Sequence, residues 1–578
     1  MNATTRRNIL SLLLGAQPRP EHGDQGGGAG GSSDPAGPGP GAVPVAGSDG
    51  TTPHEDLVLH NGKIRTFDDR NHQVSAVAIS QGRIVATGSS LGQVQHAVPG
   101  NPRVIDLKGH VAVPGMIEGH VHFVSLAIRP GYHVVIENAR DIKGIQTLLA
   151  KRRVGVPTGQ FITAMGGWHP NMFAEHRLPT LAELDAAVPD RPVLLYQGFT
   201  GPAWTNSLGK AYFEAAAVPS VVAADGTIAA GANAEAALYN VRLTQTFADR
   251  KRSTLDAQGY AASVGITAVI DEVGFPIPGP PLPNQALSNF DGFRCYDAWL
   301  ALHAQGKSLI RLQANFLHNQ NDINLPELSQ RLKNQYQLYG DDQVMTGGIG
   351  EWGAPGDGVG PVWAKAQQLI AQAQWRNNNR ALSLASFQAE VEGYEAVNAQ
   401  YDITGLRWRI DHVPVVTKDL LDRMVALGGG VQCGAFSYVS GVGPAAGAPF
   451  RTILDHGIKA GIHQDGVHIA PLNPWYGIYY ATTGRNALGV LINDGQQITR
   501  DEAVRLYTRD NAWFLNMEDR LGTIETGKLG DLVVLDKDYR TVSDEGLKDL
   551  QPILTVVGGK VVFDSGALNP PSPKGPHR

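Results

Sequence analysis

Residues 113–122 read VPGMIEGHVH, so a Pro-Gly pair closely precedes two histidines that are separated by one residue. In a β-strand the side chains at i and i+2 project from the same face, which places the imidazoles of His120 and His122 side by side. Such a pair of imidazoles suits a divalent metal ion. A surface or structural pair of histidines is the alternative interpretation, and the strand context favours the metal site.

Residues 113–519 alternate short apolar runs with helical segments. Predicted strands cover 265–271, 309–316 and 406–412, and a predicted helix covers 362–374. Repeated βα units indicate an α/β protein with a parallel sheet, and we expect a TIM-like (β/α)8 barrel, with a doubly wound sheet as the alternative. The sequence contains no glycine-rich dinucleotide fingerprint, P-loop or G-x-S-x-G nucleophile elbow.

Both ends of this region are flanked by predicted hairpin strands. Residues 57–67 contain an Asn-Gly turn between two apolar runs, and residues 554–563 contain a Gly-Gly turn in the same setting. We therefore expect residues 55–112 and 520–566 to form one small, discontinuous β-sandwich domain, with the barrel inserted between its halves.

Composition excludes several classes of partner. The chain has 578 residues, 42% of them hydrophobic and 18% charged, and a formal charge of -6, which indicates a folded protein with little attraction for nucleic acid or an anionic membrane. No apolar run approaches the roughly 20 residues that span a bilayer. Cys295 and Cys433 cannot make a disulfide framework, so histidines and carboxylates must hold any metal. We expect a small-molecule substrate. The protein could form a homo-oligomer, but the sequence carries no signal of its oligomeric state.

The N-terminal segment differs from the rest in composition. Residues 1–54 are rich in Gly, Pro and Ser and predict a flexible tail, as do residues 567–578. Arg6 and Arg7 precede a short apolar run in a pattern that resembles a twin-arginine export signal, although no A-x-A cleavage site follows. We expect a cytoplasmic protein, with export to the periplasm or outside as the alternative.

Two downstream motifs could complete a metal site. His412 ends a predicted strand, where barrel enzymes place functional side chains, although a structural histidine is the alternative. Residues 461–466 place His463 and Asp465 on one face of another strand end. Buried beside a metal, Asp465 would shuttle protons; otherwise it would cap a loop.

Taken together with the segment GTIETGKLGDLVVLD at 522–536, these motifs resemble the metal-dependent amidohydrolase superfamily. Residues 179–193 and 204–207 resemble in particular its amidohydrolase family 3, or YtcJ-like, branch. The resemblance extends from about residue 56 to 563. It implies a (β/α)8 barrel that carries metal at the carboxyl ends of its strands, flanked by a small β domain from both termini.

The resemblance also implies a set of ligands. His120 and His122 match the first strand of the family pattern, His412 the sixth and Asp465 the eighth. Where the branch usually has a lysine, residues 347–352 read GGIGEW, so Glu351 is expected to replace it as a carboxylate able to bridge two metals, or else to be an ordinary loop residue.

The fifth strand departs from the pattern. A histidine is expected near residues 381–387, yet none occurs between His318 and His412. Three protein ligands and a water suffice for catalytic Zn²⁺, so the expected cofactor is zinc, one ion or two. His463 could supply a substitute imidazole, or a hydrogen bond to a ligand.

Further residues could contact the substrate. We expect Trp168 to line the substrate mouth, and His463 is a further candidate substrate contact. Arg485 could bind a substrate carboxylate, with a structural ion pair as the alternative.

These features lead to a hypothesis of function. We expect a metal-dependent hydrolase that cleaves a carbon–nitrogen bond, amide-like or formamide-like and not a peptide bond, in a small molecule. A metal would activate water, and Asp465 would accept its proton and pass it to the leaving nitrogen. The alternatives are a degenerate barrel that binds a ligand without turnover, and a deaminase or cyclic-amide hydrolase of the same superfamily.

Overall fold

The computed structural model describes residues 55–165, 167–272, 295–439 and 447–569. The predicted N-terminal tail with its Arg6-Arg7 pair lies outside these residues, as does most of the predicted C-terminal tail. No helix within the described ranges combines the length and the apolar character needed to cross a membrane.

Eight parallel strands form the central part of the molecule, in two four-stranded sheets with the orders β16-β15-β14-β8 and β17-β18-β19-β20. A parallel bridge between Ile349 and Asn377 connects the two sheets. The strands are β8 (Met116–Val121), β14 (Ile266–Asp271), β15 (Arg311–Phe316), β16 (Val344–Ile349), β17 (Asn378–Arg380), β18 (Arg409–Asp411), β19 (Gly430–Gly434) and β20 (Lys459–His463).

The first and last of these strands are linked through the side chain of Asn511. Its Nδ2 donates to the carbonyl oxygens of Ile117 in β8 (2.7 Å) and Ile462 in β20 (2.8 Å), and its Oδ1 accepts from the Ile462 amide. The Gln432 side chain of β19 also donates to the carbonyl of Gly119 at 3.0 Å. Strands β8 and β20 therefore lie beside one another. The predicted α/β class is confirmed.

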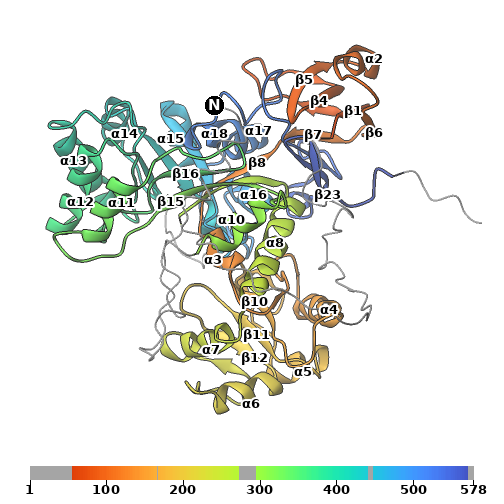
Figure 1. Cartoon of the computed structure of the whole chain (residues 1–578), viewed down its shortest axis with the longest axis vertical. Helices are drawn as coiled ribbons and strands as arrows, with labels where there is room; N and C mark the ends of the chain where they lie inside the picture. The colour runs from red at the N-terminus through yellow and green to blue at the C-terminus, as the bar shows by residue number, and fades with distance from the viewer. Residues whose placement is uncertain (1–54, 166, 273–294, 440–446, 570–578) are drawn as a thin grey trace, which may run out of the picture.

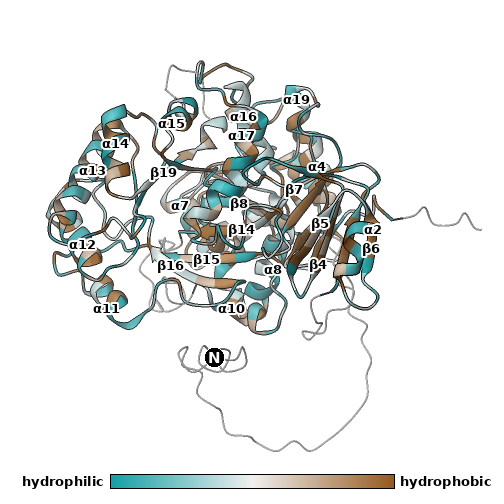
Figure 2. Ribbon diagram, turned by 90° about the horizontal axis from the view of Figure 1, so that it is seen from above, coloured by the Kyte–Doolittle hydropathy of each residue, from teal (hydrophilic) through white to brown (hydrophobic). Residues whose placement is uncertain are grey.

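Amphipathic helices cover the outside of these strands, with hydrophilic residues on their outer surfaces (Figure 2). In α14, for example, Leu420, Leu421 and Met424 are buried while the charged residues face outward. The helices are α3 (Phe123–Ala127), α8 (Phe247–Ser263), α10 (Asp297–Ala304), α11 (Pro326–Asn334), α12 (Pro361–Gln372), α13 (Leu384–Asn398), α14 (Lys418–Ala426), α15 (Phe450–His456), α16 (Pro474–Thr483), α17 (Arg500–Arg505), α18 (Asn511–Phe514), the 3-10 turn η3 (Ala435–Val439) and the π-helical turn η4 (Leu506–Asp510).

A separate five-stranded sheet, which the sequence analysis did not distinguish from the barrel, is inserted between α3 and α8. It lies with its helices at the bottom of Figure 1, away from the parallel strands. Its order is β13-β12-β11-β10-β9, and we call it the insertion. Its elements are β9 (Tyr132–His133), α4 (Ile142–Arg153), β10 (Ile162–Met165), η2 (Pro170–Met172), α5 (Leu181–Ala187), β11 (Val193–Tyr196), β12 (Ala203–Thr205), α6 (Ser207–Ala215), β13 (Thr227–Ile228) and α7 (Ala232–Arg242).

Strands from the two ends of the chain share one six-stranded sheet, β23-β22-β21-β7-β2-β3, in which Val113 of β7 pairs with Val533 of β21. A four-stranded sheet, β5-β4-β1-β6, shares a hydrophobic core with it that includes Leu57, Ile79 and Val534. The elements are β1 (Leu57–His60), β2 (Lys63–Arg65), β3 (Gln73–Val74), β4 (Ala76–Ser80), β5 (Arg83–Gly88), α2 (Leu91–Val94), η1 (Gln95–Ala97), β6 (Arg103–Asp106), β7 (Val111–Pro114), β21 (Leu532–Leu535), α19 (Asp544–Leu547), β22 (Pro552–Val557) and β23 (Lys560–Asp564).

Candidate metal centre

Four histidine side chains meet where the parallel strands end. His120 and His122 come from the end of β8, His412 follows β18, and His463 ends β20. The ring centroid of His120 lies 5.5 Å from that of His122, 4.5 Å from that of His412 and 5.0 Å from that of His463. All four side chains are buried. The fold thus brings together residues that are far apart in the sequence.

Two buried carboxylates complete the cluster. Glu351 follows β16, and its Oε2 lies 3.4 Å from His122 Nε2 and 4.0 Å from His120 Nε2. Asp465 follows β20, and its Oδ1 lies 3.7 Å from His122 Nε2. The structure therefore gathers all five residues predicted as metal ligands, because each is placed at the carboxyl end of a parallel strand.

Two of these residues adopt a left-handed backbone conformation. His412 has φ of 63° and Asp465 has φ of 50°, values that are uncommon for residues other than glycine and cost about 1–3 kcal/mol each. The turn at Asp465 is held by Glu118 of β8, whose Oε1 accepts a hydrogen bond of 2.7 Å from the Gln464 amide. Both sharp turns come directly after a strand and place the ligand side chain within the cluster.

Hydrogen bonds on Nδ1 orient the two histidines of β8. His120 Nδ1 donates to Asp411 Oδ2 at 2.6 Å, and His122 Nδ1 donates to the carbonyl of Glu272 at 3.0 Å. Both rings consequently present Nε2 to the carboxylates. Such partners fix the tautomer and raise the basicity of metal-binding histidines.

The donor set fits a divalent metal ion. Among the described residues, His120 Nε2 and Asp465 Oδ1 are buried without a hydrogen-bond partner, which is costly for polar atoms. A tetrahedral ion with bonds of about 2.1 Å requires ligand atoms about 3.4 Å apart. The distances here are close to this value: Glu351 Oε2 lies 3.4 Å from His122 Nε2 and 4.0 Å from His120 Nε2, and Asp465 Oδ1 lies 3.7 Å from His122 Nε2. His120, His122 and Glu351 form one possible set, and His120, His412 and Asp465 another.

Burial and mutual contact set the protonation of the cluster. Burial, with the nearby His412, holds the pKa of His120 well below its usual value, so the ring is neutral, as a metal ligand must be. Burial would raise the pKa of Glu351, but hydrogen bonds from His122 and His412 outweigh it and hold that pKa well below 4.5. Burial also lowers the pKa of His122, yet the contact with Glu351 raises it to about 9. Burial raises the pKa of Asp465, which suits a proton acceptor that must later donate.

The fifth strand lies earlier than the sequence analysis placed it, and it supplies an arginine. Strand β17 covers Asn378–Arg380, before the expected segment 381–387. Arg380 Nη1 lies 3.4 Å from Glu351 Oε1, and the guanidinium lies 4.3 Å from the ring centroid of Trp352. The position where an imidazole was expected therefore carries a permanent cation.

His463 neither bonds to a ligand nor lines an open mouth. Its ring is fully buried, 4.7 Å from that of His412, and among the described residues neither ring nitrogen has a hydrogen-bond partner. The hydrogen bond expected from the sequence is absent there. Burial strongly lowers the pKa of His463, so the ring is neutral.

The other two predicted substrate contacts differ in exposure. Trp168 is buried in the insertion, where its ring lies 5.8 Å from that of Trp204. Arg485 is exposed and donates to the carbonyl of Gly489 in its own loop at 2.8 Å. The structure does not bring Arg485 to the metal cluster, because its short loop holds the guanidinium at the surface.

Several residues at the site were missed by the sequence analysis. Phe199, from the insertion, places its ring 5.4 Å from that of His122, and Phe436 of η3 lies 5.3 Å from His412. Asp411 and Glu272 accept the hydrogen bonds that orient His120 and His122. Asp411 ends β18, and Glu272 directly follows β14. His412 was predicted as a site residue because it lies at the end of a strand, and the same criterion would have identified Glu272.

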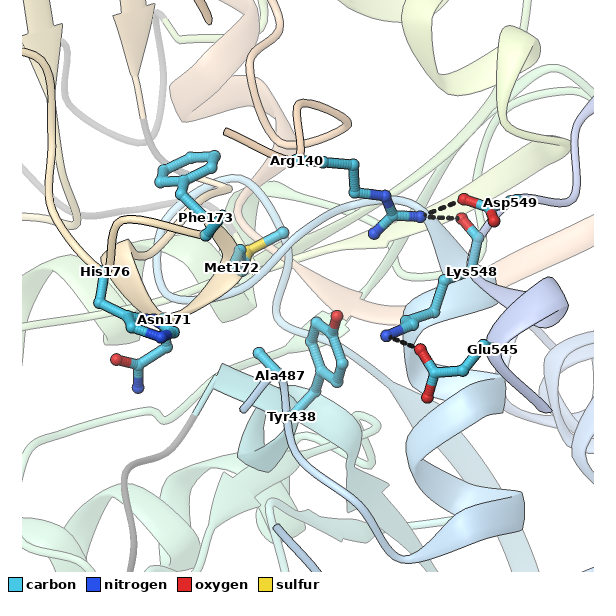
Figure 3. A pocket seen from close by; sticks show the side chains of 11 residues that line it. Arg140, Asn171, Met172, Phe173, His176, Tyr438, Ala487, Glu545, Lys548 and Asp549 are labelled. Carbon is cyan, nitrogen blue, oxygen red and sulfur yellow. Dashed lines mark hydrogen bonds and ion pairs between the residues drawn. The ribbon is translucent and has the colours of Figure 1, made fainter. Parts of the chain in front are cut away.

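A surface cavity of about 290 Å³ lies between the insertion and α19 (Figure 3). Its charges are paired within it: Arg140 with Asp549 at 2.5 Å, and Lys548 with Glu545. The lining residues are Arg140, Asn171, Met172, Phe173, Ala174, His176, Tyr438, Ala487, Glu545, Lys548 and Asp549. None of them belongs to the histidine and carboxylate cluster.

Comparison with known proteins identifies the family. A family model described as the amidohydrolase family matches residues 103–563. The chain therefore belongs to the amidohydrolase family, which confirms the family and the hydrolase class predicted from the sequence.

The chain is 24% identical to N-substituted formamide deformylase of Arthrobacter pascens over 573 residues, covering 89% of this chain and 99% of that protein. It is 22% identical to the putative amidohydrolase YtcJ of Bacillus subtilis, covering 88% of this chain and 99% of that protein.

Solved structures agree on the fold. An uncharacterized metal-dependent hydrolase from Pyrococcus horikoshii matches with a TM-score of 0.57 at 18% identity, covering 85% of this chain and 99% of the other. At this level of identity the likeness concerns the fold alone.

Proposed function

We propose that this protein is a zinc-dependent hydrolase that cleaves the carbon–nitrogen bond of an N-substituted formamide or a related small amide. The observation that carries the proposal is the convergence of His120, His122, Glu351 and Asp465 in a buried site, where Glu351 Oε2 lies 3.4 Å from His122 Nε2 and 4.0 Å from His120 Nε2, and Asp465 Oδ1 lies 3.7 Å from His122 Nε2. The similarity to N-substituted formamide deformylase along nearly the whole of both chains supports the choice of substrate class.

In this proposal the metal, when bound, supplies Lewis acidity that activates water at neutral pH. Asp465 accepts the proton that the attacking water loses as its oxygen bonds to the carbonyl carbon. Asp465 then donates this proton to the nitrogen as the C–N bond breaks, so that a carboxylic acid and an amine leave. His412 Nε2, 3.9 Å from Asp465 Oδ2, is positioned to donate a hydrogen bond to the carbonyl oxygen.

We further propose that the eight parallel strands close into a (β/α)8 barrel, and that the terminal strands form the discontinuous β sandwich. The Asn511 side chain between β8 and β20 supports closure, and the pairing of β7 with β21 supports the shared sandwich.

A hydrolysis assay tests the function. Purified protein would be incubated with a panel of N-substituted formamides and simple amides, before and after removal and return of Zn²⁺, and release of formate, acid or amine would be measured. We expect turnover that is lost with the metal and restored by it. A protein that binds metal but hydrolyses none of the panel would favour the ligand-binding alternative, and release of ammonia from a ring amine would favour a deaminase.

A further inference from the structure

The two oxygens of Glu351 face different surroundings. Oε2 faces the two histidines at the end of β8, and lies 3.4 Å from His122 Nε2 and 4.0 Å from His120 Nε2. Oε1 faces His412 Nε2 at 3.2 Å and Arg380 Nη1 at 3.4 Å. A carboxylate that bridges two metal ions uses one oxygen for each, so Oε1 is where a second ion would bind.

Arg380 already places a positive charge at Oε1. Its guanidinium stays protonated at any physiological pH and offers only donors, so it cannot serve as a ligand. Its position is fixed by the ring of Trp352, 4.3 Å away, and by Asp357, whose Oδ1 lies 3.3 Å from Nε. A divalent ion at Oε1 would meet this cation at close range in a buried, weakly screened site.

A second guanidinium occupies the remaining acidic pocket. Glu272 and Asp411, together with His120, form another set of possible ligands. Arg409 lies within that set: its Nη2 donates to the Glu272 carboxylate and lies 3.1 Å from Asp411 Oδ2. Asn378 of β17 also donates to Asp411 Oδ2, at 2.7 Å. Asn378 of the fifth strand and Arg409 of the sixth thus offer donors to these carboxylates.

We propose that Arg380 takes the place of a second cation, so that this centre binds a single divalent metal ion on the side of His120, His122 and Asp465. The inference rests on the proposed function, because it requires that the cluster binds a metal. It deepens that proposal by fixing the number of ions and by assigning the fifth-strand residue an electrostatic role.

Metal stoichiometry tests the inference without reference to activity. The full-length protein and the Arg380→His variant would be loaded with excess Zn²⁺, desalted and analysed for zinc per chain. We expect about one ion for the wild type and about two for Arg380→His, because the substitution removes the cation and adds an imidazole. Loading with Mn²⁺ should give an exchange-coupled electron paramagnetic resonance signal in the variant alone.

Arg407→His is the matched control. Arg407 pairs with Glu518 at 2.7 Å, lies 4.9 Å from the Trp513 ring and has a side chain 28% exposed, against 29% for Arg380. It should keep one ion per chain. If Arg380→His fails to fold, Arg380→Gln keeps a donor without the charge and should also gain metal.

Two ions in the wild type, or one ion in folded variants of Arg380, would overturn the inference while leaving the proposed function intact. A wild-type chain that takes up no metal would overturn both.

Discussion

Replacing Asp411 by asparagine should weaken metal binding by about 10- to 100-fold, because Asp411 orients a proposed metal ligand from 291 residues away in the sequence. Its Oδ2 accepts from His120 Nδ1 at 2.6 Å and from Asn378 Nδ2 at 2.7 Å. Asparagine keeps one acceptor oxygen but loses the charge that raises the basicity of the His120 ring.

The expected loss corresponds to about 1.4–2.8 kcal/mol of binding free energy. Alanine should cost more, because it leaves two buried donors, those of His120 and Asn378, without their acceptor. At about 1–3 kcal/mol for each unpaired donor, Asp411→Ala should lower the free energy of unfolding by at least about 2 kcal/mol.

The assay is competition for Zn²⁺ with a chromophoric chelator, combined with thermal unfolding. Asp531→Asn is the control, since Asp531 is also a buried carboxylate but pairs with Arg311 at 2.7 Å, outside the metal cluster. It should lower stability without changing metal affinity. Wild-type affinity in folded Asp411→Asn would refute the orienting role.

The remaining predictions concern catalysis, pH and thiol chemistry. Asp465→Asn should lower kcat on an N-substituted formamide by about 10²- to 10⁴-fold, because the proton acceptor is lost; unchanged turnover would exclude that role. Burial raises the pKa of Glu137 from 4.5 to about 7, so its contribution to stability is present below pH 4.5 and is lost as pH rises through that window. Thermal midpoints measured at pH 5 and pH 8 should therefore differ less in Glu137→Gln than in the wild type. Cys295 and Cys433 are buried, so a thiol reagent should label them only after unfolding, and rapid labelling of the native protein would contradict their burial.

Much of the site could be predicted from local sequence. His120 and His122 share a strand face through the two-residue period, and Asp465 follows a recognisable strand, so these three ligands carried a local signal, whereas Glu351 was predicted through the family resemblance. The α/β class followed from the alternation of apolar runs and helical segments.

What could not be predicted depends on contacts between distant segments. The pairing of His120 with Asp411 and the approach of Phe199 from the insertion depend on how the strands are arranged in space. The hydrogen bond from the Arg485 guanidinium to the carbonyl of Gly489 has no local signal in the sequence. Arg380 has none either, because the family pattern leads to the expectation of a histidine on the fifth strand.

Anomalous X-ray diffraction from crystals of the zinc-loaded protein tests whether the histidine and carboxylate cluster binds the metal. We expect an anomalous peak at the zinc edge within bonding distance of His120 Nε2, His122 Nε2, Glu351 Oε2 and Asp465 Oδ1. Crystals of metal-loaded protein with no peak at these four atoms, or with zinc bound only elsewhere, would contradict it.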